Sequence, residues 1–433
     1  MNANFYFIFH EIKLKSMSDE VFSKSPEIEI PPLIPPLVTP IISKFNTKSS
    51  NINTITLDRS LGKGAYGTVY LCRDENGDEL AVKCIKSKDF GIPSLIEAAI
   101  MSTIHHPYLS KALKIHSTPD KLYIVQELAI SDLRVYRQNN SLSMETIVKW
   151  THMIAQAISC LHKNDIIHGD IKASNVLVCS DMKVKLTDFT LTTHINWKND
   201  YRPCTSTHRP LEVWLLSTGP IGQRWNKSID IWSFGCTIFE MIYGKNLFAS
   251  QSRDASINAI LDWYKYLNQP TNVTYRDVFH YSFNLPDSFV SSNMNDLIIS
   301  LLTEKRPTIN DILKNKLFNH LSVLPSMVIS APITIMLPKT ENKIKKQLST
   351  VIHDEITIEL AFNLYARIVG MVNSNDKIKM ITCAWIAHKM VHRTNISLNY
   401  DLHEILQMER LICNYLSYRL WCKTPQTVIK VNL

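Results

Sequence analysis

His168-Gly169-Asp170-Ile171-Lys172-Ala173-Ser174-Asn175 is the stretch that decides the interpretation of this sequence, together with Asp188-Phe189 a little further on. An acid, a lysine two residues later and an asparagine three beyond it are suited to phosphoryl transfer. The acid orients an attacking hydroxyl and accepts its proton, the lysine offsets charge on the transferred group, and the amide and the second acid each hold a metal ion. Apolar strands are predicted at 176–178 and 184–186, which makes the stretch a loop and brings Asp188 to the end of a strand.

A glycine-rich pattern precedes this loop in the chain, Leu61-Gly62-Lys63-Gly64-Ala65-Tyr66-Gly67-Thr68-Val69. The same glycine spacing occurs in dinucleotide-binding folds, but there a helix must follow it. Here a strand follows, and residues 71–73 and 79–85 are predicted to form a hairpin around the turn Glu75-Asn76-Gly77-Asp78. The glycines then allow a hairpin tip to lie over a nucleotide without clashes from Cβ atoms.

Together these motifs resemble those of a protein kinase, and their local sequence resembles that of a cyclin-dependent kinase. Ala81-Val82-Lys83 resembles the strand whose lysine grips the α- and β-phosphates of ATP. A helix is predicted over 93–103, and Glu97 on it is the natural partner of that lysine. Gly91-Ile92-Pro93-Ser94-Leu95-Ile96-Glu97 is similar to the PSTAIRE helix of cyclin-dependent kinases with two residues missing, and Glu97 stands nine residues before His106-Pro107, as in that family.

The resemblance continues through the rest of the first 322 residues. Lys121-Leu122-Tyr123-Ile124-Val125-Gln126-Glu127-Leu128 resembles the last strand and the hinge, where Gln126 falls at the gatekeeper position. Thr205 matches the threonine that ties the catalytic acid to its lysine in Ser/Thr kinases. Arg306 matches the arginine that pairs with Glu212.

The resemblance implies an α+β, bilobal protein-kinase fold over residues 53–322, with ATP and Mg²⁺ as cofactors and a protein as substrate. Asp230-Ile231-Trp232-Ser233-Phe234-Gly235 matches the buried helix that anchors the catalytic loop. The catalytic residues it implies are Asp170, Lys172 and Asn175, and the metal ligands are Asn175 and Asp188. The nucleotide contacts it implies are Leu61, Gly62, Gly64, Gly67, Val69, Ala81, Lys83, Glu97 and, through backbone groups that face adenine, Glu127 and Ala129.

Two positions depart from the kinase pattern. Gly169 stands where kinases that depend on a phosphorylated activation loop carry arginine, so no guanidinium is available there to clamp a phosphothreonine. Thr190 replaces the glycine after Asp188-Phe189, which restricts the backbone of this loop. Neither change removes a phosphate or metal contact.

Beyond a predicted linker at 323–345, three helices are predicted at 357–371, 376–392 and 401–420. Residues 380–387 are apolar nearly all round, so they are expected at the centre of a small bundle. The sequence of this region resembles a cyclin box. The matching segments are Ile386-Ala387-His388-Lys389-Met390, Glu404-Ile405-Leu406-Gln407-Met408-Glu409-Arg410, Arg419-Leu420 and Thr424-Pro425. The resemblance implies that Lys389 and Glu409 form a buried pair facing the kinase. It makes 346–433 a small all-α, cyclin-like domain, and the combination resembles kinase–cyclin fusions encoded by giant DNA viruses.

The composition limits which classes of protein this chain can belong to. The net charge of +8 is mild for 433 residues and the basic residues are scattered, which favours ordinary solvated surface over nucleic-acid binding. No apolar run approaches the ~20 residues of a membrane span, and no signal-peptide pattern is present. Nine dispersed cysteines without paired spacing indicate reduced thiols, so an intracellular protein is expected, in the cytoplasm or nucleus of a host cell. Residues 1–52 are expected to be a Pro-rich disordered tail, or else a docking peptide for a proline-binding module.

Three functions compete at this stage. The first is an active Ser/Thr kinase whose own cyclin-like module positions Glu97 in cis. The second is a catalytically weak pseudokinase scaffold that binds host cyclins or kinases, with Gly169 and Thr190 as marks of decay. The third treats 345–433 as an independent adaptor. Retention of the catalytic, metal-binding and phosphate-binding residues favours the first.

Overall fold

The computed structural model describes most of the chain between residues 56 and 420. The described residues are 56–64, 67–74, 76–86, 91–118, 121–197, 201–215, 225–248, 252–267, 292–325, 327–328, 338–368, 376–392, 400–416, 418 and 420. The predicted tail at 1–52, and Arg419, Thr424 and Pro425 of the cyclin-like resemblance, lie outside them.

The first lobe is built on an antiparallel sheet with strand order β1-β2-β3-β6-β5. Its strands are β1 Thr56–Gly64, β2 Gly67–Arg73, β3 Glu79–Lys86, β5 Lys114–Ser117 and β6 Lys121–Glu127. Gly64 pairs with Gly67 where β1 turns into β2, so the glycine-rich pattern forms a hairpin tip. The hairpin predicted over 71–73 and 79–85 is confirmed as β2 paired antiparallel with β3. A Cβ on Gly67 would lie 2.7 Å from the Cys84 carbonyl oxygen, so glycine is required where β2 crosses β3 this closely.

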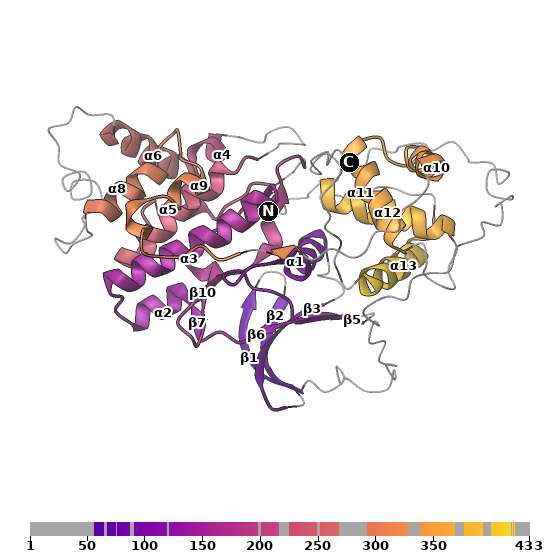
Figure 1. Cartoon of the computed structure of the whole chain (residues 1–433), viewed down its shortest axis with the longest axis horizontal. Coiled ribbons are helices and arrows are strands. Elements are labelled where there is room, and N and C mark those ends of the chain that lie inside the picture. The colour runs from indigo at the N-terminus through magenta and orange to yellow at the C-terminus, as the bar shows by residue number, and fades with distance from the viewer. Residues whose placement is uncertain are drawn as a thin grey trace, which may run out of the picture.

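Helix α1, Ile92–Thr103, confirms the helix predicted over 93–103. Pro93 stands in its first turn, where the missing N–H costs no helical hydrogen bond. Its residues from Ser94 to Met101 are buried without interruption. A helix buried on every side needs neighbours on every side, and α1 has the second lobe on one side and the C-terminal helices on the other (Figure 1).

The second lobe is mostly helical. Its helices are α2 Leu133–Asn139, α3 Met144–Lys163, α4 Leu211–Leu215, α5 Ser228–Tyr243, α6 Arg253–Leu267, α8 Ser292–Leu301 and α9 Ile309–Ile312. Its short strands are β7 Ser131–Asp132, β8 Ile166–Ile167, β9 Val176–Val178, β10 Val184–Leu186 and β11 Thr193–His194. The apolar residues Ile147, Trp150, Ile154, Ile158 and Leu161 of α3 are buried. The strands predicted at 176–178 and 184–186 are β9 and β10, paired antiparallel. Helix α5 is buried along almost its whole length.

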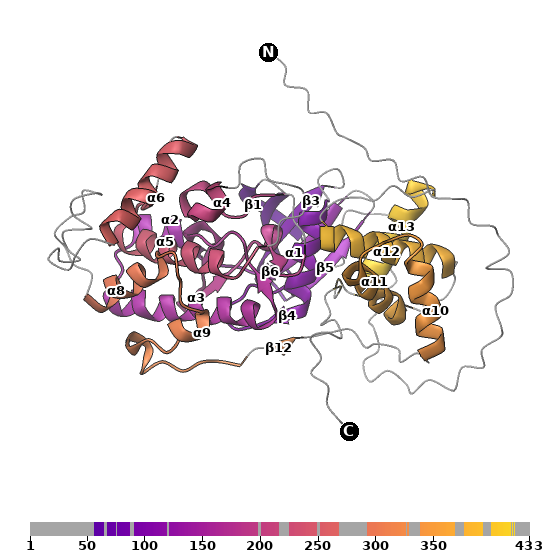
Figure 2. The same cartoon turned by 90° about the horizontal axis from the view of Figure 1, so that it is seen from above.

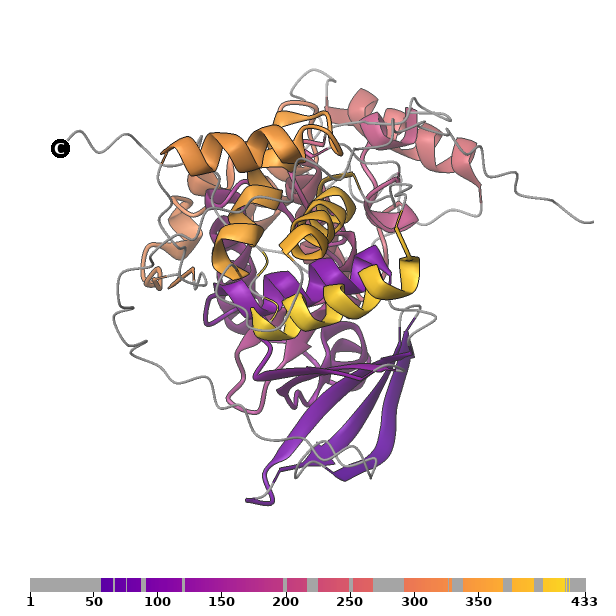
Figure 3. The same ribbon diagram turned by 90° about the vertical axis from the view of Figure 1, so that its right-hand side faces the viewer.

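In the C-terminal part of the chain, the described residues form four helices beside the first lobe (Figures 1 and 2). They are α10 Pro338–Leu348, α11 Glu355–Ile368, α12 Asp376–His392 and α13 Leu402–Tyr415. Helix α12 packs against α10, α11, α13 and α1, which confirms its predicted place at the centre of a bundle. In Figure 3, which looks from the C-terminal side, α13 in yellow lies in front of the indigo α1. The observed architecture is therefore an α+β fold of two lobes, as predicted, followed by a helical domain.

Three sequence-based boundaries need correction. The predicted linker at 323–345 is not free of structure, because β12, Met327–Val328, pairs with β4, Ile104–His105, and α10 begins at Pro338. The helix predicted at 357–371 begins at Glu355 because the Asp354 side chain accepts a hydrogen bond from the Thr357 amide, 2.8 Å away. The helix predicted to reach residue 420 ends at Tyr415.

One continuous hydrophobic core joins the parts of the molecule. It includes Leu95 and Ile96 of α1, Ile154 of α3 and Ile386 and Met390 of α12. The C-terminal helices are therefore packed on the kinase lobes and not merely tethered to them. Among the described helices, none combines the length and the apolarity that crossing a membrane would require.

Candidate functional site

The loop that carries the phosphoryl-transfer motif is anchored from beneath by α5. Asp230 is fully buried, and its two carboxylate oxygens accept hydrogen bonds from the His168 and Gly169 amides, each 2.9 Å away. His162 on α3 contacts the same carboxylate at 2.9 Å. A buried carboxylate with several donors fixes the backbone firmly, because each unmade bond would leave a charged group unsatisfied. The expected anchoring role of Asp230 is thus visible as hydrogen bonds.

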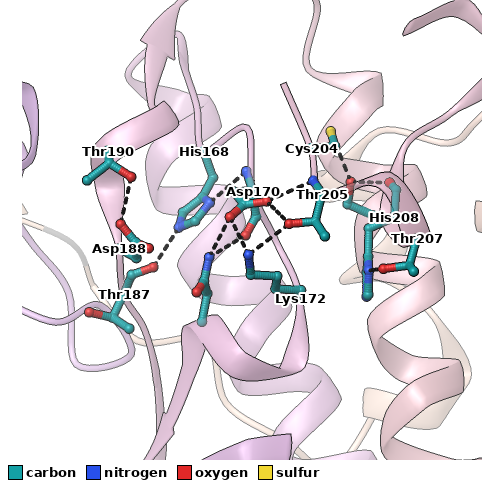
Figure 4. Close-up of polar contacts among 12 residues, drawn as sticks. His168, Asp170, Lys172, Thr187, Asp188, Thr190, Cys204, Thr205, Thr207 and His208 are labelled. Atoms are coloured by element: carbon teal, nitrogen blue, oxygen red, sulfur yellow. Dashed lines mark hydrogen bonds and ion pairs between the residues drawn. The ribbon is translucent and has the colours of Figure 1, made fainter. Parts of the chain in front are cut away.

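Asp170 is the centre of the site, and its carboxylate is held by three neighbouring residues (Figure 4). Thr205 donates to Oδ1 from its hydroxyl at 2.7 Å and from its amide at 2.9 Å. Lys172 Nζ lies 2.8 Å from Oδ2 and donates to the Thr205 hydroxyl at 2.8 Å, and Asn175 Nδ2 donates to Oδ2 at 3.0 Å. Burial alone would raise the pKa of Asp170, but the Lys172 ammonium and the hydrogen bonds outweigh burial and hold this pKa below its ordinary value. Asp170 is therefore an ionised carboxylate at neutral pH.

Lys83 of β3 and Glu97 of α1 form the ion pair that the sequence predicted. Lys83 Nζ lies 2.7 Å from both Glu97 oxygens, and the Glu97 side chain is only 3% exposed. Burial raises the pKa of Glu97, opposed by the Lys83 charge and reinforced by the negative charge of Asp188. The negative charge of Asp188 therefore acts on this ion pair.

The predicted nucleotide contacts gather on neighbouring positions of the first-lobe sheet. Strand register places Gly62 of β1 opposite Val69 of β2, and Val69 opposite Lys83 of β3. Ala81 is buried and stands two residues before Lys83, on the same face of the sheet. Leu61, Gly64 and Gly67 lie at the tip of the same hairpin, whereas Ala65 and Tyr66 lie outside the described residues.

The hinge follows β6. Glu127 is the last residue of β6, where it stands opposite Leu80 of β3, and its side chain forms an ion pair with Lys185 of β10. Ala129 follows in the connection to the second lobe. The polar side chain of Gln126, at the gatekeeper position, accepts a hydrogen bond from the Ser110 hydroxyl at 2.9 Å. Sequence reasoning missed Ser110, because no local pattern marks a residue that lies far from Gln126 in the chain.

Asp188 begins the turn η4, Phe189–Leu191, from a left-handed backbone conformation with φ 62°. Phe189 is fully buried, and its ring meets the His168 ring edge-on with centroids 5.4 Å apart. The Thr190 hydroxyl donates to Asp188 Oδ1 at 2.8 Å. His168 contacts the Thr187 carbonyl oxygen at 3.0 Å on the other side, so the two loops are joined through side chains (Figure 4).

The donor set fits Mg²⁺. The amide nitrogen of Asn175 donates to the Asp170 carbonyl oxygen at 2.8 Å and to the Asp170 carboxylate at 3.0 Å. The amide oxygen of Asn175 takes no part in these two contacts. Asp188 adds a carboxylate. Within the described ranges no group of three or more His, Cys, Asp or Glu side chains could hold a metal ion by itself. An amide oxygen and a carboxylate suit Mg²⁺, which takes one or two protein oxygens and fills its octahedron with phosphate oxygens and water.

The activation segment, from Asp188 to Glu212, is tied to both the loop and the lobe. Gly169 has φ +76°, and a Cβ there would lie 2.6 Å from the Leu191 carbonyl oxygen. At the end of the segment Glu212 pairs with Arg306 through two contacts of 2.6 and 3.1 Å, as predicted. Cys204, beside Thr205, is also left-handed at φ 65°, and its carbonyl oxygen accepts a hydrogen bond from Arg209 at 2.7 Å.

The C-terminal helices contact the first lobe through polar as well as apolar groups. The Ser102 hydroxyl of α1 donates to the Tyr418 carbonyl oxygen at 2.9 Å, and the Ser117 hydroxyl of β5 contacts the Asn414 side chain at 3.1 Å. Lys389 and Glu409 form the expected buried pair, with Nζ–O distances of 2.7 and 3.0 Å. Their expected contact with the segment before Glu97 falls partly on residues 87–90, which lie outside the described residues.

Comparison with known proteins agrees with this geometry. Residues 55–318 match the protein kinase domain family. The chain is also similar to cell division control protein 2 homolog 3 of Trypanosoma brucei brucei, with 28% identity over 264 residues. That alignment covers 56% of this chain and 83% of the relative.

Proposed function

Because this chain belongs to the protein kinase family, we propose that it transfers the γ-phosphate of ATP to serine and threonine hydroxyls of protein substrates. The observation that carries the proposal is the bonding of Asp170, whose carboxylate is bound by Lys172, Asn175 and Thr205 at once. In the same structure Lys83 and Glu97 are paired. In protein kinases the lysine–glutamate pair must be in place, together with the acid that holds Mg²⁺, before phosphate is transferred.

Each residue has a role that follows from its position. Asp170, kept ionised by its neighbours, orients the substrate hydroxyl and accepts its proton. Lys172 lies beside that carboxylate and stabilises negative charge on the group in transit. Lys83, held by Glu97, is placed for the α- and β-phosphates. Asn175 and Asp188 would hold Mg²⁺, which when bound neutralises charge on the phosphates.

The backbone at Gly169 supports activity that does not depend on phosphorylation of the activation segment. Glycine offers no cation to a phosphothreonine at this position, so a phosphate would gain no clamp there. The segment is instead held by bonds already present, from Thr205 to Asp170 and from Arg306 to Glu212. We infer that the segment adopts its working conformation through these contacts.

The C-terminal helices are proposed to act as a cyclin-like activator in cis. Support comes from their position: they share a hydrophobic core with α1, and Tyr418 accepts a hydrogen bond from Ser102 at the end of that helix. Helix α1 carries Glu97, so cover of its outer side stabilises the position in which Glu97 meets Lys83. Tethering makes the docking intramolecular, at an effective concentration of about millimolar. A separate host cyclin would then be unnecessary.

The test of the kinase assignment is Mg²⁺-dependent transfer of labelled phosphate from ATP by the purified full-length chain. A generic basic protein and a proline-directed peptide serve as substrates, and Asp170→Asn serves as the matched inactive control. We expect transfer that needs Mg²⁺ and is lost in the control. No transfer by a correctly folded wild-type chain would contradict the assignment and favour a scaffold that binds host cyclins or kinases.

A further inference from the structure

Thr190 makes a contact with the proposed metal site that the activity described above does not require. It is 3% exposed, and its hydroxyl donates to Asp188 Oδ1 at 2.8 Å (Figure 4). We propose that Thr190 is a positioning residue: its hydroxyl fixes the orientation of the Asp188 carboxylate and so strengthens the binding of a divalent cation with nucleotide. The inference rests on the proposed function, because it assigns Asp188 to that cation.

The backbone around Asp188 is already held on both sides. Asp188 is fixed in the left-handed region, and Phe189 is packed against His168 in the core. The turn is closed by the Thr192 amide, which donates to the Phe189 carbonyl oxygen at 3.1 Å. The hydrogen bond from the Thr190 hydroxyl acts on the Asp188 carboxylate itself and opposes its rotation.

The contact leaves room for the cation. A carboxylate has two oxygens with about four acceptor sites, and a single hydroxyl takes one of them on Oδ1. Oδ2 and the remaining site on Oδ1 stay available to a hard cation such as Mg²⁺. A hydroxyl donor on a carboxylate is also a charge-assisted hydrogen bond, stronger than one between neutral groups.

Burial keeps this hydrogen bond intact. The Thr190 side chain is buried and its neighbour Phe189 is fully buried, so water competes little for the hydroxyl. The Thr190 hydroxyl therefore holds the Asp188 carboxylate in place before the cation arrives. A ligand that is oriented in advance loses less rotational freedom on binding.

The experiment measures cation binding separately from catalysis. Binding of Mn²⁺ to the full-length chain in the presence of ADP is followed by the electron paramagnetic resonance signal of free Mn²⁺. Thr190→Val removes the hydroxyl at nearly constant volume, and Thr190→Ser keeps it. We expect Thr190→Val to weaken Mn²⁺ binding about three- to tenfold, which is about 0.7–1.4 kcal/mol at the usual conversion. Thr190→Ser should bind Mn²⁺ like the wild type.

Activity gives a second readout. In Thr190→Val the Mg²⁺ concentration for half-maximal transfer should rise by the same factor, whereas the rate at saturating Mg²⁺ should change little. A merely structural residue would instead lower the saturated rate and the thermal midpoint. If Thr190→Val does not fold, Thr190→Ala removes the same hydroxyl and replaces it in the comparison.

Equal Mn²⁺ affinity in wild type and Thr190→Val would overturn the inference, as would a Thr190→Ser variant that is as weak as Thr190→Val. These outcomes leave the kinase assignment intact. A wild-type chain that binds no Mn²⁺ with ADP would instead remove the proposed function, and the role of Thr190 with it.

Discussion

Replacing Lys389 by methionine tests how the C-terminal helices are held together and what they do for the kinase. Lys389 Nζ lies 2.7 and 3.0 Å from the two oxygens of Glu409, and the two side chains are 8% and 2% exposed. Trp385 Nε1 also donates to Glu409 at 3.2 Å, and Glu409 would keep this hydrogen bond when Lys389 is replaced. Methionine preserves the length and packing of the lysine stem, so the change isolates the charge.

Removing one member of a buried ion pair leaves the other charge uncompensated, at a cost of about 3–5 kcal/mol. We therefore expect Lys389→Met to lower, by about that amount, the free energy that is needed to unfold α12 and α13 locally. The double variant Lys389→Met/Glu409→Gln should recover most of it, because no buried charge remains. Transfer activity should fall in the single variant and return in the double one, since α12 packs against α1.

The assay is native-state hydrogen exchange of the α12 and α13 amides, which reports local opening separately from unfolding of the kinase lobes. Lys149→Met is the matched control, because it breaks the exposed pair of Lys149 with Glu145 at 2.6 Å and should change nothing measurable. A Lys389→Met variant as stable as Lys149→Met would refute the reasoning. So would a double variant that is no more stable than the single one.

Three further predictions concern the kinase site. Asp188→Asn should leave the fold intact and lower the transfer rate about 100- to 1000-fold, because a charge that holds the metal is lost; unchanged turnover would remove Asp188 from the site. Alanine at both Ser206 and Thr207, or phosphatase treatment, should leave most activity in place, since the glycine before Asp170 cannot clamp a phosphate; collapse of activity after phosphatase treatment would show that another basic residue binds one. The depressed pKa of Asp170 means that its contribution to stability is present above its unfolded pKa of 3.8 and is lost only as the pH falls below that value. The rate profile from about pH 5 to 8 should therefore show no acid limb from Asp170, whereas a limb in this range that moves upward in Thr205→Val would assign it to Asp170.

The contacts within the catalytic loop could be expected from the sequence, because chemistry dictates the spacing there. Asp170, Lys172 and Asn175 must reach one phosphoryl group, so they sit within one loop, and their contacts in the structure follow that requirement. Pairing of Lys83 with Glu97 was also predictable, because each residue stands on an element with a clear pattern, an alternating strand and a helix. The assigned roles of these residues remain predictions until activity is measured.

What the sequence could not show depends on contacts between distant segments. Most of helix α10 falls in the predicted linker because the helix is rich in charged residues and buries Ile344 and Leu348 alone among its described apolar side chains, too few to give a visible period. The predicted C-terminal end of α13 is too late. Tyr418 adopts φ 57°, a left-handed conformation, and no glycine or asparagine at this position marks it in the sequence. That conformation serves a long-range contact, the hydrogen bond from Ser102, which local sequence does not encode.

The measurement that tests the central claim most directly compares the transfer rate of the full-length chain with that of residues 1–322 alone, each purified without any added cyclin. If the C-terminal helices hold α1 where Glu97 meets Lys83, the full chain is active by itself, residues 1–322 lose most of that activity, and added 345–433 restores part of it. Full activity of residues 1–322 alone would contradict activation in cis and leave the C-terminal helices as an independent adaptor.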